Sequence, residues 1–224
     1  MSPNMIGADL LPPWVAQATR DVSLRTPVAG ELPEPLRRSI VKRQRAFVAG
    51  RCAASAALAS LDGDRTHEVG IGVRGEPQWP SGTVGSITHD AHQARCAAAF
   101  TRNATGIGID VEHRISNARA DRVRSSIADR SELAEGLWPS AFDASTRLTI
   151  TFSAKEALYK CLYPQVGRVF DFLDVAVLHV DAGTGRIALR LCGDLSAGWT
   201  GGTVVTGRFA VDDTRVSTAF LIER

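Results

Sequence analysis

The sequence predicts an α+β fold built from two similar halves. Its 224 residues show a long helical pattern followed by short strand-like segments, and this order occurs twice. The segment around 101–106 separates the two runs, so we expect an N-terminal half at 1–105 and a C-terminal half at 106–224. No sequence repeat relates the halves, so this division depends on the order of the elements.

The composition is that of an ordinary globular protein. Hydrophobic residues make up 44% of the chain and charged residues 22%. The net charge of +2 argues against a protein that binds nucleic acid through its overall charge. The four cysteines are scattered, which argues against a zinc site and gives no disulfide framework. Since no signal segment and no apolar run of about 18 residues is apparent, we expect a cytoplasmic protein that does not enter a membrane.

The first half is expected to contain one long helix and then strands. Residues 1–31 are rich in proline and irregular, with short extended pieces near 14–16 and 21–24. Proline is tolerated in a first helical turn, so Pro33-Glu34-Pro35 predicts a helix over 34–61. Gly50 interrupts this helix and predicts the close approach of another segment or of a ligand. Turn residues bound four short segments, which predict strands at 69–73, 84–87, 95–100 and 106–111.

The second half repeats this order. Residues 116–136 are rich in arginine and predict a helix, and a second long helix is expected over 144–162. Strands are expected at 175–180, 186–191, 203–210 and 216–222.

Two carboxylates, Asp110 and Glu112, end the predicted strand at 106–111. Residues two apart on a strand point the same way and lie about 6.6 Å apart, so both side chains could converge on one cation. The plain alternative is an exposed strand end with two solvated acids. Gly106 and Gly108 favour a functional interpretation, because glycines let another group approach the backbone.

A second charged group follows about forty residues later, where Glu156 lies between Lys155 and Lys160. The Ser153-x-x-Glu156 spacing is typical of a capping box, so these residues alone indicate a helix start with an ordinary Glu–Lys pair. A helix N-terminus is also a favourable phosphate site. Taken with the two strand acids, three carboxylates and two amines are the parts that hold Mg²⁺ against a polyphosphate.

Residues 85–89 place hydroxyls and an imidazole at a strand end. Ser86 and His89 are suited to donate hydrogen bonds to phosphate, although a structurally satisfied histidine is a serious alternative. A Ser-x-x-His pair also suggests a hydrolase, but the Gly-x-Ser-x-Gly elbow is missing.

Three arginines extend this candidate phosphate site. Arg43 and Arg51 are eight apart on the predicted helix and can serve one face, and Arg74 precedes a turn. Arginine is suited to bidentate phosphate contacts. The plain alternative for a basic helix face is simple solvation.

In this order the motifs resemble those of the 4′-phosphopantetheinyl transferases, in the monomeric two-half variety found with surfactin-type and enterobactin-type synthetases. The block at 77–89 is most similar to the enterobactin branch. The resemblance covers residues 37–160 or so. Four blocks carry it: Arg43…Gly50-Arg51-x-Ala53-Ala54, Pro77-x-Trp79-Pro80…Gly85-Ser86-Ile87-Thr88-His89, Gly108-Ile109-Asp110-x-Glu112, and Phe152-Ser153-x-Lys155-Glu156-Ala157-x-Tyr159-Lys160.

The resemblance implies a fold of two α+β halves related by a pseudo-twofold axis, with coenzyme A in the cleft between them. It implies transfer of 4′-phosphopantetheine from coenzyme A to a serine of an apo carrier protein, which releases adenosine 3′,5′-bisphosphate. The pathway would be siderophore, non-ribosomal peptide or polyketide synthesis. The implied partner is an acidic carrier domain, and we expect the arginines from Arg114 to Arg130 to form part of its docking surface. We expect a monomer that binds neither nucleic acid nor membrane.

The resemblance also implies roles for individual residues. Asp110, Glu112 and Glu156 would hold Mg²⁺, and Glu156 would also take the proton from the incoming serine. Lys155 and Lys160 would contact the phosphates. The adenosine 3′-phosphate and the pyrophosphate would be held by Arg43, Arg51, Arg74, Ser86 and His89.

Two positions depart from the family pattern. Asp90 follows His89 where a small residue or cysteine is expected, and it adds a negative charge near a phosphate site. Gln44 stands where an acid is common.

Two other classes of function remain open. One is a non-catalytic module that binds coenzyme A or a nucleotide, which would not need three converging acids. The other is a hydrolase with Ser86 or Ser153 as nucleophile.

Overall fold

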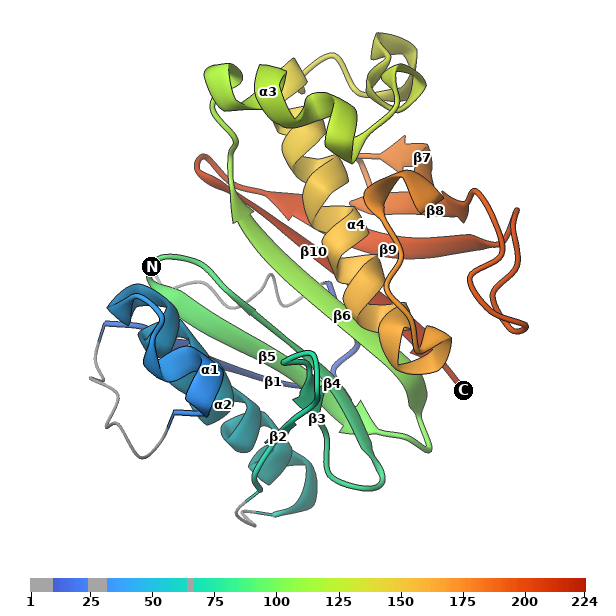
Figure 1. The fold of residues 1–224 in the computed structure, drawn as a ribbon. Coiled ribbons are helices and arrows are strands. Elements are labelled where there is room, and N and C mark those ends of the chain that lie inside the picture. Colours follow the sequence, from blue (N-terminus) through green and yellow to red (C-terminus); the bar gives the residue numbers. More distant parts are fainter. Residues whose placement is uncertain (1–9, 24–31, 64–66) are drawn as a thin grey trace.

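The computed structural model describes residues 10–23, 32–63 and 67–224 and confirms the α+β class (Figure 1). In the first half, helix α2 (Val41–Asp62) covers one face of an antiparallel sheet. The strand order is β1-β5-β4. The strands of this sheet are β1 (Ala16–Asp21), β4 (Thr83–His89) and β5 (Gln93–Phe100). Within the part of residues 1–31 that the structure describes, the chain is more regular than expected, because β1 pairs along its whole length with β5. The rest of that segment, including residue 24 of the expected piece at 21–24, lies outside the described residues.

The predicted helix over 34–61 is interrupted near its start. Helix α1 (Glu34–Arg37) ends before α2 begins, and Ile40 between them has an extended backbone. The side-chain amide of Gln44, through Nε2, donates hydrogen bonds to the carbonyl oxygens of Leu36, Arg37 and Ser39, each 3.0 Å long. Gln44 thus satisfies the last carbonyl groups of α1, a task that needs a donor and that an acidic side chain could not perform.

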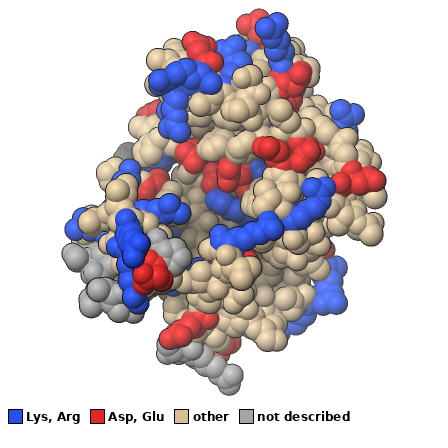
Figure 2. Space-filling view, viewed as in Figure 1, with Lys and Arg blue, Asp and Glu red and all other residues tan. Residues whose placement is uncertain are grey.

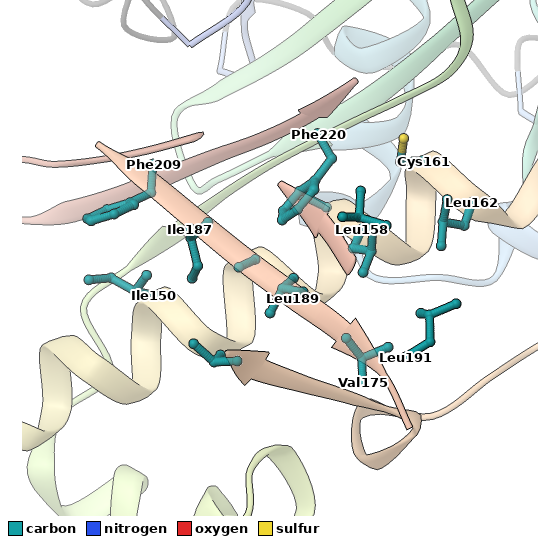
Figure 3. Close-up of a cluster of buried hydrophobic side chains, with 14 of the residues drawn as sticks. Ile150, Leu158, Cys161, Leu162, Val175, Ile187, Leu189, Leu191, Phe209 and Phe220 are labelled. Carbon is teal, nitrogen blue, oxygen red and sulfur yellow. The ribbon is translucent and has the colours of Figure 1, made fainter. Parts of the chain in front are cut away.

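The second half contains a five-stranded antiparallel sheet with helix α4 (Ala144–Val166) packed on one face. The strand order is β6-β10-β9-β8-β7. The strands are β6 (Ala104–His113), β7 (Val175–Asp181), β8 (Arg186–Leu191), β9 (Val204–Val211) and β10 (Arg215–Glu223). Large side chains from α4 and from the sheet form a closed core, which includes Leu158, Leu189 and Phe220 (Figure 3).

The predicted helix over 116–136 is also shorter than expected. Helix α3 (Asn117–Ile127) stops at its last buried residue, and two short 3-10 helices follow, η2 (Arg130–Leu133) and η3 (Glu135–Leu137). Asp129 starts η2 with a capping box that it forms with Glu132. A cap fixes a new helix start, so the regular helix cannot continue through this point.

The two sheets meet at their edge strands, β4 and β6, which lie side by side without a backbone ladder between them. Two hydroxyls of β4 take the place of the missing ladder. The oxygen of Ser86 accepts a hydrogen bond from the amide of Ile109 (3.0 Å), and that of Thr88 accepts one from the amide of Val111 (3.2 Å). The halves are therefore joined directly beside the candidate site.

A small hairpin stands apart from both sheets. It is formed by β2 (Gly70–Ile71) and β3 (Pro77–Gln78). Across the described ranges, no helix combines the length and the apolar character that crossing a bilayer requires.

Candidate active site at the junction of the two halves

Two glycines allow α4 to lie directly on β6. A Cβ atom at Gly108 would lie 1.8 Å from the carbonyl oxygen of Ala157, and one at Gly106 would lie 2.5 Å from that of Cys161. Both oxygens belong to the backbone of α4, so they cannot move aside unless the helix moves. The expectation that these glycines admit another segment is confirmed, and the segment is the helix that carries the second charged group.

Asp110 is the centre of the site and is only 5% exposed. Its Oδ1 accepts hydrogen bonds from Lys160 Nζ at 2.7 Å and from Thr88 Oγ1 at 3.2 Å. Its Oδ2 accepts one from Ser153 Oγ at 2.9 Å. Donors from β4 and α4 therefore fix this carboxylate from both sides, and the structure brings together Asp110 and Lys160 as the sequence suggested.

Glu112 and Glu156 lie within electrostatic reach of Asp110. Burial raises the pKa of Glu112 to about 7, and the negative charges of Asp110 and Glu156 add to this effect while Lys160 opposes it. Burial also raises the pKa of Glu156, with Lys160 opposing and Asp110 adding. One amine thus faces three carboxylates, and a divalent cation would neutralise the excess negative charge.

The three acids do not form a finished metal site in this structure. Among the described residues, no group of three or more His, Cys, Asp or Glu side chains is arranged to hold an ion. Instead, the amine of Lys160 forms an ion pair with Oδ1 of Asp110. The chemistry of the donor set fits Mg²⁺, since all three candidates are carboxylates and their mutual repulsion favours a cation between them.

The helix expected over 144–162 is confirmed, but the interpretation of Ser153 as a helix start is wrong. Helix α4 begins at Ala144, and Asp143 is its N-cap, which accepts a hydrogen bond from the amide of Thr146 at 2.7 Å. Ser153 lies in the middle of the helix, and its hydroxyl bonds Asp110 and, at 2.9 Å, Thr218 Oγ1. No helix N-terminus is therefore available here for a phosphate.

Lys155 has different partners from the phosphates that the resemblance implies. Its side chain is 1% exposed, and its Nζ donates to Glu132, at 2.8 Å, and to the carbonyl oxygens of Ile127 and Phe172. All three of its hydrogens are used. Lys155 and Lys160 are five residues apart, a rotation of about 140° around a helix, so the two amines leave α4 in different directions.

Ser86 also differs from its expected role. It is 2% exposed, and its hydroxyl is used to join β4 to β6. Ser153 is fully buried as well and is bonded to Asp110. A hydrolase with either serine as nucleophile is therefore wrong, because a nucleophile must be reached by its substrate.

His89 lies within electrostatic reach of Lys160 and Asp110, as expected for a residue of the site. It is exposed at the end of β4. Desolvation by the surrounding protein and the positive charge of Lys160 both lower its pKa. Because Lys160 acts on His89 as well as on Asp110, the imidazole lies near the acids of the other half. Acidic and basic side chains gather in the middle of the face drawn in Figure 2.

The predicted arginines lie on two elements of the first half. Arg43 is exposed on α2, whereas Arg51 is half-buried with its guanidinium 5.0 Å from the centre of the Phe47 ring. Arg51 Nη1 is buried and finds no hydrogen-bond partner in the described part of the chain. A buried donor without a partner is suited to an anionic ligand. Gly50 permits the packing of α2 on β4, since a Cβ there would lie 3.0 Å from Ile87 Cγ2.

The third arginine, Arg74, lies exposed in the β2–β3 hairpin, where its amide donates to Glu76 Oε2 at 2.9 Å. Burial raises the pKa of Tyr159 on α4, and the charge of Arg74 opposes this rise. The hairpin of the first half is therefore within electrostatic reach of α4.

A pocket of about 180 Å³ lies beside Glu156 on α4. Most of its wall is apolar or aromatic and includes Tyr159, Phe170 and Phe172. Glu156 is one of its lining residues, with Lys155 and Asp171 as the other charged ones, so a ligand in this mainly apolar pocket could reach the acid.

Sequence reasoning missed several residues of this site. Thr88 supports Asp110 directly and Thr218 does so through Ser153, but these partners lie 22 and 65 residues away. Thr88 belongs to the block at 77–89 without being assigned a role there, and no local signal marks Thr218. Glu132 was also missed, although Asp129-x-x-Glu132 matches a capping box. Its buried carboxylate accepts hydrogen bonds from Lys155 and from the amide of Val177.

Comparison with known proteins gives matches over both halves. Residues 32–99 match the family model described as 4′-phosphopantetheinyl transferase N-terminal domain, and residues 106–215 match that of the 4′-phosphopantetheinyl transferase superfamily. The 4′-phosphopantetheinyl transferase PptT of Mycobacterium tuberculosis is 32% identical over 235 residues, which cover 99% of this chain and 100% of the relative. The 4′-phosphopantetheinyl transferase Npt of Nocardia iowensis is 31% identical over 191 residues, 81% of this chain and 83% of the relative. Enterobactin synthase component D of Salmonella typhimurium is 38% identical over 125 residues, 56% and 50% of the two chains.

Proposed function

We infer the function from the family, because this chain belongs to the 4′-phosphopantetheinyl transferase superfamily. We propose that it transfers 4′-phosphopantetheine from coenzyme A to a serine hydroxyl of an apo carrier protein, giving holo-carrier and adenosine 3′,5′-bisphosphate. The observation that carries this proposal is the cluster of Asp110, Glu112, Glu156 and Lys160 beside His89, where the two halves meet. We further propose that the carriers serve siderophore, non-ribosomal peptide or polyketide synthesis, since relatives include an enterobactin synthase component.

The two halves would divide the work. We propose that residues 1–105 hold coenzyme A through Arg43, Arg51, Arg74 and His89. The unpartnered donor of Arg51 supports this assignment. Residues 106–224 would hold the metal and dock the carrier. The uncharged pantetheine arm suits the mainly apolar pocket beside Glu156.

The reaction requires one new P–O bond and the loss of another. The serine oxygen attacks the phosphorus that bears pantetheine, the bond to adenosine 3′,5′-bisphosphate breaks, and the serine proton needs an acceptor. Burial raises the pKa of Glu156, which makes it a stronger base near neutral pH once it is ionised, and we propose it as that acceptor. Lys160 would donate hydrogen bonds to the pyrophosphate, and its position beside Asp110 supports this role, whereas Lys155 would support α4 through Glu132. Mg²⁺ held by Asp110, Glu112 and Glu156 would neutralise negative charge on the leaving group.

The test of this function is a mass measurement. The protein is incubated with coenzyme A, Mg²⁺ and several apo carrier proteins, and the proposal expects each accepted carrier to gain the mass of phosphopantetheine. A protein that binds coenzyme A but adds no mass to any carrier would instead be a non-catalytic binding module.

The raised pKa of Glu112 predicts how pH and Mg²⁺ act together on stability. Its folded-state pKa of about 7 lies above the ordinary value of 4.5. This group therefore stabilises the fold fully below pH 4.5, and that contribution is lost as the pH rises through 7. Mg²⁺ binds the ionised form, so it should raise the thermal midpoint more near pH 8 than near pH 5.5.

Differential scanning fluorimetry with and without Mg²⁺ checks this prediction. Glu112→Gln is the control, because it removes the titrating group. An equal rise at both pH values in the wild type would show that Glu112 does not bind the ion.

Helix α3 and its flanks present exposed arginines that suit an acidic carrier. They are Arg114, Arg119, Arg122, Arg124 and Arg130. The double variant Arg122→Glu/Arg124→Glu is expected to raise the KM for the carrier about tenfold at low salt while kcat stays the same, because surface charges steer association. The effect should fade at high salt.

Steady-state kinetics at two salt concentrations measures this effect. Arg186→Glu/Arg190→Glu on β8 is the matched control, since both arginines are exposed on the five-stranded sheet. An unchanged KM for the α3 variant, or an equal change in the control, would reject α3 as the docking surface.

A further inference from the structure

One ion pair joins the two halves. Arg215 Nη1 lies 3.1 Å from Asp90 Oδ2, and the side chains are 14% and 2% exposed. Among the described residues, every other ion pair lies within one half. Asp90 is also one of the two residues that depart from the family pattern.

On the first half, Asp90 shapes the turn after β4. Its Oδ1 accepts hydrogen bonds from the amides of His92 (2.7 Å) and Gln93 (2.8 Å). Burial alone would raise the pKa of Asp90, but these bonds and the bond from Arg215 outweigh it and lower the pKa. The carboxylate is therefore ionised and fully engaged, and it adjoins His89 in the chain.

On the second half, Arg215 begins β10. In the strand register it lies opposite His113, and the next pair is Val216 with Glu112. The ion pair is thus one residue from His89 on one side and one strand pair from Glu112 on the other. It therefore connects the end of β4, which carries His89, to the β6–β10 pair, which carries Glu112, and these two side chains are expected to contact the same ligand.

A further arginine, Arg95, lies close enough to Arg215 and Asp90 for its charge to matter, so the negative charge of Asp90 offsets two positive charges. Arg95 on β5 is 2% exposed. Burial chiefly lowers its pKa, Arg215 lowers it further, and Asp90 raises it. Without the charge of Asp90, the repulsion between Arg95 and Arg215 would be opposed mainly by Asp212, which is more exposed and lies 3.6 Å from Arg215.

We propose that Asp90 and Arg215 form a positioning pair that holds His89 of the first half at a fixed place relative to Glu112 of the second half. This inference rests on the proposed function, since the shared ligand is the pyrophosphate of coenzyme A. The negative charge that looked unfavourable beside a phosphate site is neutralised across the boundary between the halves.

The experiment is a double-mutant cycle with coenzyme A binding as its main measurement. Asp90→Asn keeps an oxygen acceptor for the turn but removes the charge, and Arg215→Met removes the partner. Isothermal titration calorimetry is expected to show an affinity for coenzyme A about tenfold weaker in Asp90→Asn, as is typical when a supporting contact of a site is lost. Arg215→Met should weaken it less, because Arg95 remains beside Asp90. The double variant should be no worse than Asp90→Asn, since coupled residues are not additive.

Two further variants separate positioning from plain stability. Arg215→Lys keeps the charge and should restore most of the affinity. Asp212→Asn removes an exposed partner of the same arginine within the second half, and it should stay within about twofold of the wild type.

Two results would overturn the inference. One is variants that melt earlier yet bind coenzyme A with wild-type affinity. The other is effects of Asp90→Asn and Arg215→Met that simply add. Failure of the proposed function is distinguishable, because the wild type itself would then bind no coenzyme A and modify no carrier, and the inference would fall with it.

Discussion

Replacing Gly108 by alanine is expected to lower the free energy of unfolding by about 3 kcal/mol or more, at the upper end of what overpacking costs. The new Cβ would lie 1.8 Å from the carbonyl oxygen of Ala157 and 2.7 Å from the amide nitrogen of Cys161. Both are backbone atoms of α4, so the helix must move away from β6. Lys160 would then leave Asp110, and transfer activity should be lost together with stability.

Urea unfolding followed by circular dichroism measures this change. Gly136→Ala is the matched control, since a Cβ there meets no atom within 4 Å and the backbone is not left-handed. The control should unfold as the wild type does. A Gly108→Ala protein with wild-type stability would mean that α4 does not rest on β6 in the way described.

Asp110→Asn is expected to lower the rate of phosphopantetheine transfer about a hundredfold or more, the effect of removing one electrostatic contact to a reacting centre. The shape of the side chain is kept, and the amide oxygen can still accept bonds from Ser153 or Thr88. The charge is lost, so Lys160 loses its ion pair and the carboxylate set loses its central member. Stability should fall far less than activity.

Transfer is measured with coenzyme A and an apo carrier, and stability by thermal unfolding. Asp121→Asn is the control, because Asp121 is exposed on α3 and pairs with Arg124 of the same helix. Full activity in Asp110→Asn, or in the wild type with excess chelator, would remove the proposed metal role.

The regular elements were largely predictable because their patterns are local. The strands near Asp110 and the long helix that follows α3 lie where apolar periodicity and turn residues indicated. Their ends were less predictable, since they depend on contacts with distant residues. Helix α1 ends where Gln44 binds its carbonyl groups, and the helix after 116 ends near a carboxylate that pairs with Lys155.

The candidate site shows the same division. Spacing along the sequence indicated that Asp110 and Glu112 share a face and that Lys160 belongs with them. It could not indicate that Lys155, five residues from Lys160, faces Glu132, because that partner is 23 residues away in the chain. The prediction that Ser153 caps a helix was wrong for a related reason. The helix begins nine residues before Ser153, at Ala144, so the backbone amides that a cap would bind are already bonded within the helix.

The junction of β4 and β6 has a consequence for each half taken alone. In the intact chain, the hydroxyl oxygens of Ser86 and Thr88 accept hydrogen bonds from backbone amides of β6, the edge strand of the neighbouring sheet. If the halves were separated, the borders of both sheets would carry free amide and carbonyl groups. Such borders recruit strands from other molecules. Each isolated half is therefore expected to aggregate, so covalent continuity of the two halves protects solubility as well as building the site.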